Sequence, residues 1–111
     1  MKEDQMAKPI YKLCLVRGFT EAYYQLTKDQ KKELWDGLDK VLKPLAVEMV
    51  GPYYDCRWSN DKYGSWFIMK YPNIEAAIAD THGVEKIQLF RYMVSETILG
   101  IEATEESAVT P

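Results

Sequence analysis

One stretch of the sequence gathers groups suited to holding a ligand. Residues 53–58 read Tyr-Tyr-Asp-Cys-Arg-Trp. Side chains alternate between the two faces of a strand, which puts Tyr53, Asp55 and Arg57 on one face. A guanidinium can clamp a carboxylate through paired hydrogen bonds, so we expect Arg57 to anchor the polar end of a ligand while Asp55 and Tyr53 orient it. The alternative is an ion pair at a dimer interface or a strand edge.

The remaining members of residues 53–58 are expected to pack against helices. These are Tyr54, Cys56 and Trp58. Three charged residues of other strands are candidates to share the face of Arg57, namely Lys12, Lys70 and Glu96.

Further aromatic residues are candidates for the wall or lid of a cavity. Tyr23 and Tyr24 stand between the first predicted strand and the first predicted helix, where loop residues often carry function. They either close over a cavity or pack against the helix end. Trp66 is expected to belong to the wall.

His82 is the only histidine in the chain. Its side chain can change charge near neutral pH, so it is a candidate general base or haem ligand. In the alternative reading, His82 lies in the last turn of a helix, where the helix dipole favours an imidazolium.

Several kinds of site are disfavoured by residue types and spacing. Cys14 and Cys56 form no C-x-x-C motif, and one histidine cannot complete a Cys/His zinc site. Asp55, Asp61 and Glu96 form no close carboxylate set for a metal. The sequence has no G-x-S-x-G motif and no glycine-rich phosphate loop. We therefore expect no metal, no cofactor, and two reduced cysteines.

Charge and composition narrow the possible partners. Fourteen Lys and Arg against seventeen Asp and Glu give a net charge of −3 with no basic cluster, so neither nucleic acid nor a membrane surface is an expected partner. No apolar segment is long enough for a membrane span or a signal core, so a cytoplasmic protein is expected. Eight Tyr and three Trp against three Phe suggest a partly polar cavity or interface.

The predicted elements alternate between strands and helices along one domain. Thr27-Lys28-Asp29-Gln30 is a capping box that begins a helix, and Pro44 ends it. Asn73 is the expected N-cap of a second helix and Gly83 its stop. The other expected elements are strands over 10–16, 53–58, 65–71 and 93–101, an extended connection over 46–51, a short helix over 84–91, and a flexible tail over 103–111.

This order, β-α-β-β-α-β, predicts an α+β ferredoxin-like domain with a four-stranded antiparallel sheet and helices on one face. Both faces of the strands are apolar: in the first strand Ile10, Cys14 and Val16 oppose Leu13 and Leu15. Because soluble monomers avoid a large exposed apolar patch, we expect a homodimer whose sheets face each other.

The layout of residues 9–102 resembles the dimeric α+β barrel superfamily, which includes antibiotic biosynthesis monooxygenase-like small proteins. The resemblance implies a sheet-lined cavity for a small, mostly apolar molecule, which some members oxidise or rearrange. Haem-degrading members use an Asn on the first strand, a Trp on the third and a His on the second helix. Trp66 and His82 lie on matching elements, but the first strand of this chain has no Asn.

Three functions are compatible with these observations. The first is binding of a small, mostly apolar ligand, such as a fatty or aromatic carboxylic acid, in a cavity that Met49, Met69 and Met93 would help to line. The second is a cofactor-independent monooxygenase or isomerase that uses His82 or a tyrosine for proton transfer. The third is a structural dimer with a filled interior, in which the methionines are ordinary core.

Overall fold

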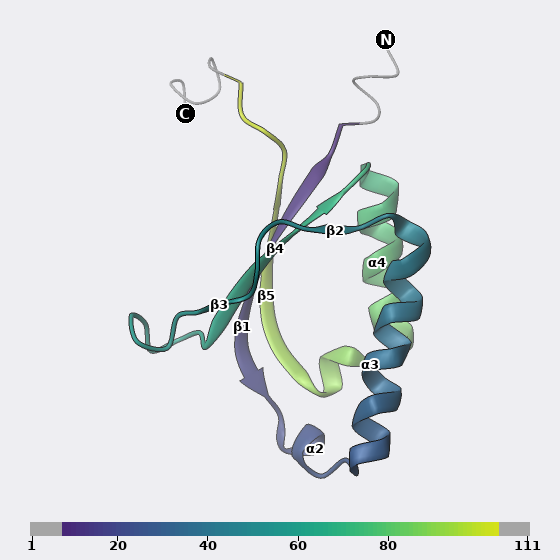
Figure 1. The fold of residues 1–111 in the computed structure, drawn as a ribbon, viewed down its shortest axis with the longest axis vertical. Coiled ribbons are helices and arrows are strands. Elements are labelled where there is room, and N and C mark those ends of the chain that lie inside the picture. The colour runs from purple at the N-terminus through teal and green to yellow at the C-terminus, as the bar shows by residue number, and fades with distance from the viewer. Residues whose placement is uncertain (1–7, 105–111) are drawn as a thin grey trace.

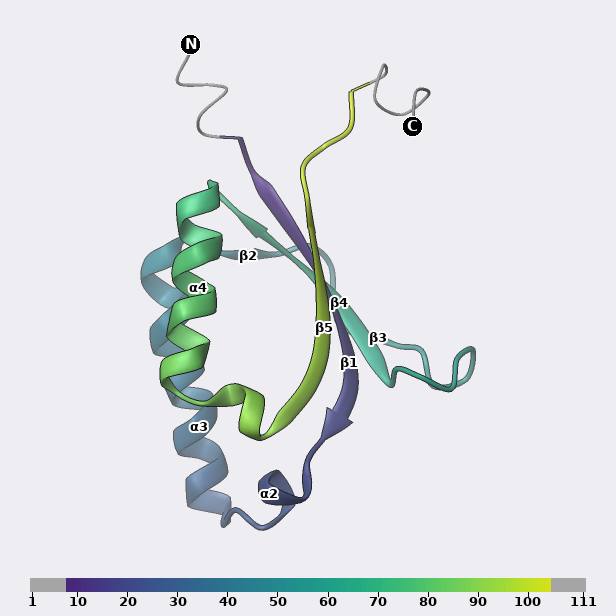
Figure 2. The same cartoon turned by 180° about the vertical axis from the view of Figure 1, so that it is seen from behind.

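The computed structural model describes residues 8–104, so most of the predicted flexible tail over 103–111 lies outside the described residues. The fold is α+β: a five-stranded antiparallel sheet carries helices α3 and α4 on one face and leaves the other face open (Figure 1, Figure 2). The strands are β1 (Ile10–Phe19), β2 (Glu48–Met49), β3 (Tyr54–Asp55), β4 (Ser65–Tyr71) and β5 (Met93–Gly100). The helices are α2 (Glu21–Tyr24), α3 (Lys28–Leu42) and α4 (Ile74–Lys86), with short 3-10 turns η1 (Lys43–Leu45) and η2 (Leu89–Arg91).

Strand β1 lies at the centre of the sheet, between β4 and β5, and β2 and β3 both pair with the outer edge of β4. The prediction of four strands is wrong, because the region between α3 and β4 forms two separate strands of two residues each. Gly51 between them has a φ of 84°, and Pro52 has no N–H to donate to a ladder. The chain therefore leaves β4 after β2 and returns to it at β3.

The alternation predicted for β1 is confirmed. Ile10, Lys12, Cys14 and Val16 are buried beneath the helices, whereas the residues between them are less buried and face the open side. On β4 the same helix side carries Phe67, Met69 and the fully buried Tyr71. The main core therefore lies between the sheet and the helices.

The capping box at the start of α3 is present as predicted. The Thr27 hydroxyl accepts a hydrogen bond from the Gln30 amide (3.1 Å), and the Gln30 side chain accepts one from the Thr27 amide (2.8 Å). The helix ends at Leu42, just before Pro44. These reciprocal bonds fix where α3 starts beside the sheet.

Helix α4 begins at the predicted cap, where the Asn73 side chain accepts a bond from the Ala76 amide (2.9 Å). The predicted stop at Gly83 is wrong, because α4 continues to Lys86. A Cβ at Gly83 would lie 2.3 Å from Cγ1 of Val41, so glycine here permits the close approach of α3 and α4. The chain turns out of the helix at Gln88, whose φ is 59°.

Candidate functional site

A cavity of about 200 Å³ lies between the sheet and the helices. Its apolar wall combines three methionines with residues from both helices and from η2. The methionines are Met49, Met69 and Met93, and the other apolar residues are Leu38, Leu42, Val84, Leu89 and Phe90. Tyr53 and Phe67 add aromatic rings, which stack on each other with centroids 4.6 Å apart. Three of these side chains are flexible thioethers, so the cavity suits an adaptable apolar ligand.

Two opposite charges lie on the wall of this cavity. Lys12 of β1 and Asp80 of α4 both line it, and they form an ion pair with 3.1 Å between Nζ and Oδ2. Lys12 is 8% exposed and Asp80 is 2% exposed. Behind them, the fully buried Tyr71 of β4 donates its hydroxyl to the same Asp80 oxygen, and the Lys12 ammonium lies 5.3 Å from the centroid of the Tyr71 ring. We call these three residues the buried polar cluster.

Two groups in this region, Tyr71 of the cluster and the neighbouring Cys14, are held in their neutral form. Burial raises the pKa of the Tyr71 hydroxyl, and the hydrogen bond to the Asp80 carboxylate and its negative charge raise it further. Burial raises the pKa of the Cys14 thiol to about 11; the Lys12 charge opposes this shift and the Asp80 charge adds to it. At neutral pH Tyr71 and Cys14 are therefore protonated.

The buried polar cluster is not predicted above, although the sequence contains a signal for it. Lys12 occupies an inward position on an apolar strand, and Asp80 follows Ala76 and Ala77 on the inner face of α4. Charged residues are seldom buried unless they are paired. Two opposite charges at inward positions of neighbouring elements therefore indicate a buried pair.

The side chains of residues 53–58 do not lie on the sides of the sheet that the sequence predicts. Tyr53 lies on the helix side as part of the cavity wall, while Tyr54 stacks on Trp66 of β4, which faces the open side, with centroids 4.4 Å apart. The prediction that Trp58 packs in the core is wrong, because Trp58 is 86% exposed. Only Cys56 of the three expected core residues is buried. Strict alternation does not apply here because β3 ends at Asp55 and a turn follows.

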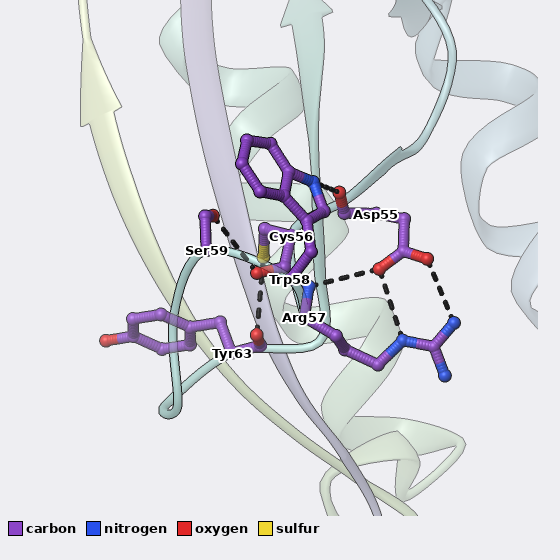
Figure 3. A network of polar contacts seen from close by, with 6 residues as sticks. All are labelled: Asp55, Cys56, Arg57, Trp58, Ser59 and Tyr63. Carbon is purple, nitrogen blue, oxygen red and sulfur yellow. Dashed lines mark hydrogen bonds and ion pairs between the residues drawn. The ribbon is translucent and has the colours of Figure 1, made fainter.

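Arg57 and Asp55 pair with each other at the base of this turn (Figure 3). The Arg57 Nε and Nη2 atoms donate to the two Asp55 carboxylate oxygens at 3.1 and 2.9 Å, and the Trp58 indole donates to the Asp55 carbonyl at 3.0 Å. Hydrogen bonds from the Arg57 side chain and amide lower the pKa of the Asp55 carboxyl to about 2. Both side chains are exposed and, with Tyr24 and Tyr53, border a shallow surface groove. An external carboxylate would have to compete with Asp55 for Arg57.

Among the other candidates, Tyr23, His82 and Lys70 do not line the cavity. Tyr23 stacks on Phe19 with centroids 4.4 Å apart and accepts a hydrogen bond from the Trp35 indole (3.1 Å). His82 is exposed in the middle of α4, although its neighbour Thr81 lines the cavity. The proposal that Lys12 and Lys70 share a face is wrong: Lys12 is buried on the helix side, and Lys70 is on the open side.

The described residues, 8–104, contain no cluster of three or more His, Cys, Asp or Glu side chains placed to hold a metal ion. None of their helices has the length and apolar character needed to cross a membrane.

No protein-family model matches the chain, and no curated protein matches its sequence. Among solved structures the chain resembles RPA0582, a protein of unknown function from Rhodopseudomonas palustris, with a TM-score of 0.51 and 17% sequence identity over 88% of this chain and 85% of that one. The methylated RPA0582 protein gives the same score and identity and is covered to 83%. At this identity the likeness concerns the fold alone: a small α+β fold with an antiparallel sheet and helices.

Proposed function

We propose that this protein is a cytoplasmic homodimer that binds a small, mostly apolar molecule in the cavity between its sheet and helices. The observation that carries the proposal is the cavity itself, with a methionine-rich wall beside a buried ion pair. Ligand sites in proteins are commonly apolar pockets with a few placed polar groups. In a structural dimer with a filled interior, the third function considered above, side chains would occupy this volume.

Binding is tested by mixing the purified protein with small fatty and aromatic alcohols and acids and recording native mass spectra. Ser95 of β5 lines the cavity, so Ser95→Phe is expected to fill it and abolish complex formation. Ala79→Phe is the matched control, because Ala79 is on the exposed side of α4 and the same aromatic group there leaves the cavity unchanged. Equal binding by the wild type and Ser95→Phe would contradict the proposal.

The dimer proposal rests on the open face of the sheet. Leu13, Leu15, Trp66 and Ile68 point to this side, and Ile98 of β5 is 58% exposed there. Charged residues surround them, including Lys70 opposite Glu48 and Glu96 bonded to Lys62. An apolar centre with a polar rim is typical of an interface between subunits.

The same proposal includes a ferredoxin-like arrangement of the strands and helices. If β2 and β3 are counted as one interrupted strand, the element order becomes β-α-β-β-α-β and β1 remains between the strands that correspond to the third and fourth. Two such sheets would then pack through their open faces, as in the dimeric α+β barrels that the sequence resembles.

Sedimentation velocity at micromolar concentration tests the dimer. Wild-type protein is expected to sediment as a dimer and Ile68→Lys as a monomer, because a buried lysine without a partner is costly in an apolar interface. Ile78→Lys is the control: Ile78 is 50% exposed on α4, away from the open face, and its replacement leaves the dimer intact. A monomeric wild type would reject this part of the proposal without affecting the cavity.

An isomerase or cofactor-independent monooxygenase is a second candidate, favoured by the titratable Lys12 and Asp80 at the cavity wall. In that case Asp80 is a better candidate for proton transfer than the exposed His82. Once a ligand is known, Asp80→Asn is expected to bind it without converting it. A pH–rate profile that depends on His82 would reverse this assignment.

A further inference from the structure

The charges at the cavity wall balance each other. One ammonium, Lys12, faces one carboxylate, Asp80, and both are nearly inaccessible to water. Asp80 receives the bonds from Lys12 and Tyr71 on the same oxygen, Oδ2. Its Oδ1 is therefore the atom able to accept another donor, and the Lys12 ammonium has three N–H groups of which one points at Asp80. The pair presents a donor and an acceptor side by side with no net charge.

We propose that the cavity selects ligands with a neutral hydroxyl head, an alcohol or a phenol, over ligands with a carboxylate head. This inference rests on the proposed function, since it concerns the same cavity. A hydroxyl is both donor and acceptor, so it can accept a bond from Lys12 and donate one to Asp80. The apolar body then lies among the methionines and rings of the wall.

A carboxylate at the same place is disfavoured for two reasons. It lacks a proton to donate to Asp80, whose negative charge repels it and offsets the attraction of Lys12. Transfer from water into the apolar cavity also removes its hydration, which is costly for any ion without a net opposite charge beside it. Arg57, which the sequence predicts as the anchor of a carboxylic acid, lies in the exposed turn, where it is paired with Asp55.

The test compares two ligands of nearly the same shape, para-propylphenol and para-propylbenzoate, by isothermal titration calorimetry of the wild-type protein at neutral pH. The phenol is expected to bind at least about tenfold more tightly. Benzoate binding as tight as phenol binding would overturn the inference while leaving the cavity as a ligand site. If neither compound binds, nor any of the alcohols and acids of the mass-spectrometric test, the proposed function itself fails.

Asp80→Asn provides the decisive variant. It removes the repelling charge and leaves Lys12 as an uncompensated cation, so the ratio of phenol to benzoate affinity is expected to fall by about tenfold or more. Met93→Leu is the matched control, because it changes the apolar wall at similar volume and affects both ligands alike. An unchanged ratio in Asp80→Asn would overturn the inference.

A double variant covers the case in which Asp80→Asn fails to fold. Lys12→Met/Asp80→Asn carries no charge in the cluster and keeps an oxygen for the Tyr71 hydroxyl. It lacks the ammonium donor, so the phenol is expected to bind at least about tenfold more weakly than to the wild type, in line with the loss of one hydrogen bond to a charged group. Wild-type affinity for the phenol in this variant would show that Lys12 does not hold the head group.

Discussion

The Lys12–Asp80 and Arg57–Asp55 pairs join similar groups at similar distances, 3.1 and 2.9 Å, but in opposite surroundings. The first pair is buried between the sheet and α4, with its residues 68 positions apart in the sequence. The second is exposed in one turn, with its residues two positions apart. Only the buried pair borders the cavity between the sheet and the helices. Only the exposed pair lies close together in the sequence, where it can be recognised as a pair.

The difference shows that burial, more than contact distance, decides what an ion pair does. Water screens the Arg57–Asp55 attraction, so its main role is to shape the turn that carries Trp58. Lys12 and Asp80 have lost most of their hydration and depend on each other and on Tyr71. A buried pair of this kind contributes little net stability but makes each member costly to remove.

The largest effect is therefore expected from breaking the buried pair. Asp80→Ala leaves the Lys12 ammonium and the Tyr71 hydroxyl without their partner and is expected to lower the free energy of unfolding by about 3–5 kcal/mol. Urea denaturation followed by circular dichroism measures the change. A loss below about 1 kcal/mol would show that water reaches Lys12 and that the pair is not buried in solution.

A triple variant separates the loss of a partner from the loss of a favourable interaction. Lys12→Met/Asp80→Leu/Tyr71→Phe replaces the whole cluster by apolar groups of similar size, and most of the stability lost in Asp80→Ala is expected to return. If the triple variant is no more stable than Asp80→Ala, the interactions within the cluster stabilise the fold in their own right. They then do more than compensate for the burial of its charges.

The same contrast explains which features could be predicted from sequence. The alternation of β1 and the capping box at Thr27 were correct because they depend on local periodicity and on residues three apart. The α+β class followed from the order of such elements. The count of strands was wrong because Gly51 and Pro52 divide the region before β4.

Tertiary packing accounts for the rest. The sequence predicts Gly83 as a helix stop, but the nearby Val41 of α3 is the reason for a glycine there. Arg57 and its neighbours are predicted to form the ligand site because residues suited to binding a ligand stand close together there in the sequence. The residues of the buried polar cluster come from three separate elements, and no local sequence pattern connects them.

An intermediate effect is expected at alkaline pH from the buried Cys14 thiol. The pKa of the Cys14 thiol is raised from 9.0 to about 11, so the unfolded chain releases this proton at a lower pH than the folded protein. Stability is therefore expected to fall as pH rises from about 9 to about 11, by roughly 1 kcal/mol per pH unit for this group. Urea midpoints across this range in the wild type and in Cys14→Val measure it. The variant should show the shallower decline, and parallel curves would mean that Cys14 is accessible to water.

The smallest effect is expected from the exposed pair. Arg57→Ala should leave the urea midpoint at neutral pH unchanged within error, at low and at high salt, because water and salt already screen the interaction. The pKa of Asp55 is lowered from 3.8 to about 2, so the small contribution of the pair is present above pH 3.8 and is lost as pH falls through about 2. A nuclear magnetic resonance titration of Asp55 should show its pKa return toward 3.8 in the variant. If Arg57→Ala instead destabilised the protein as much as Asp80→Ala does, the exposed turn would have to be packed against something in solution, and the open face beside it would be the first surface to examine.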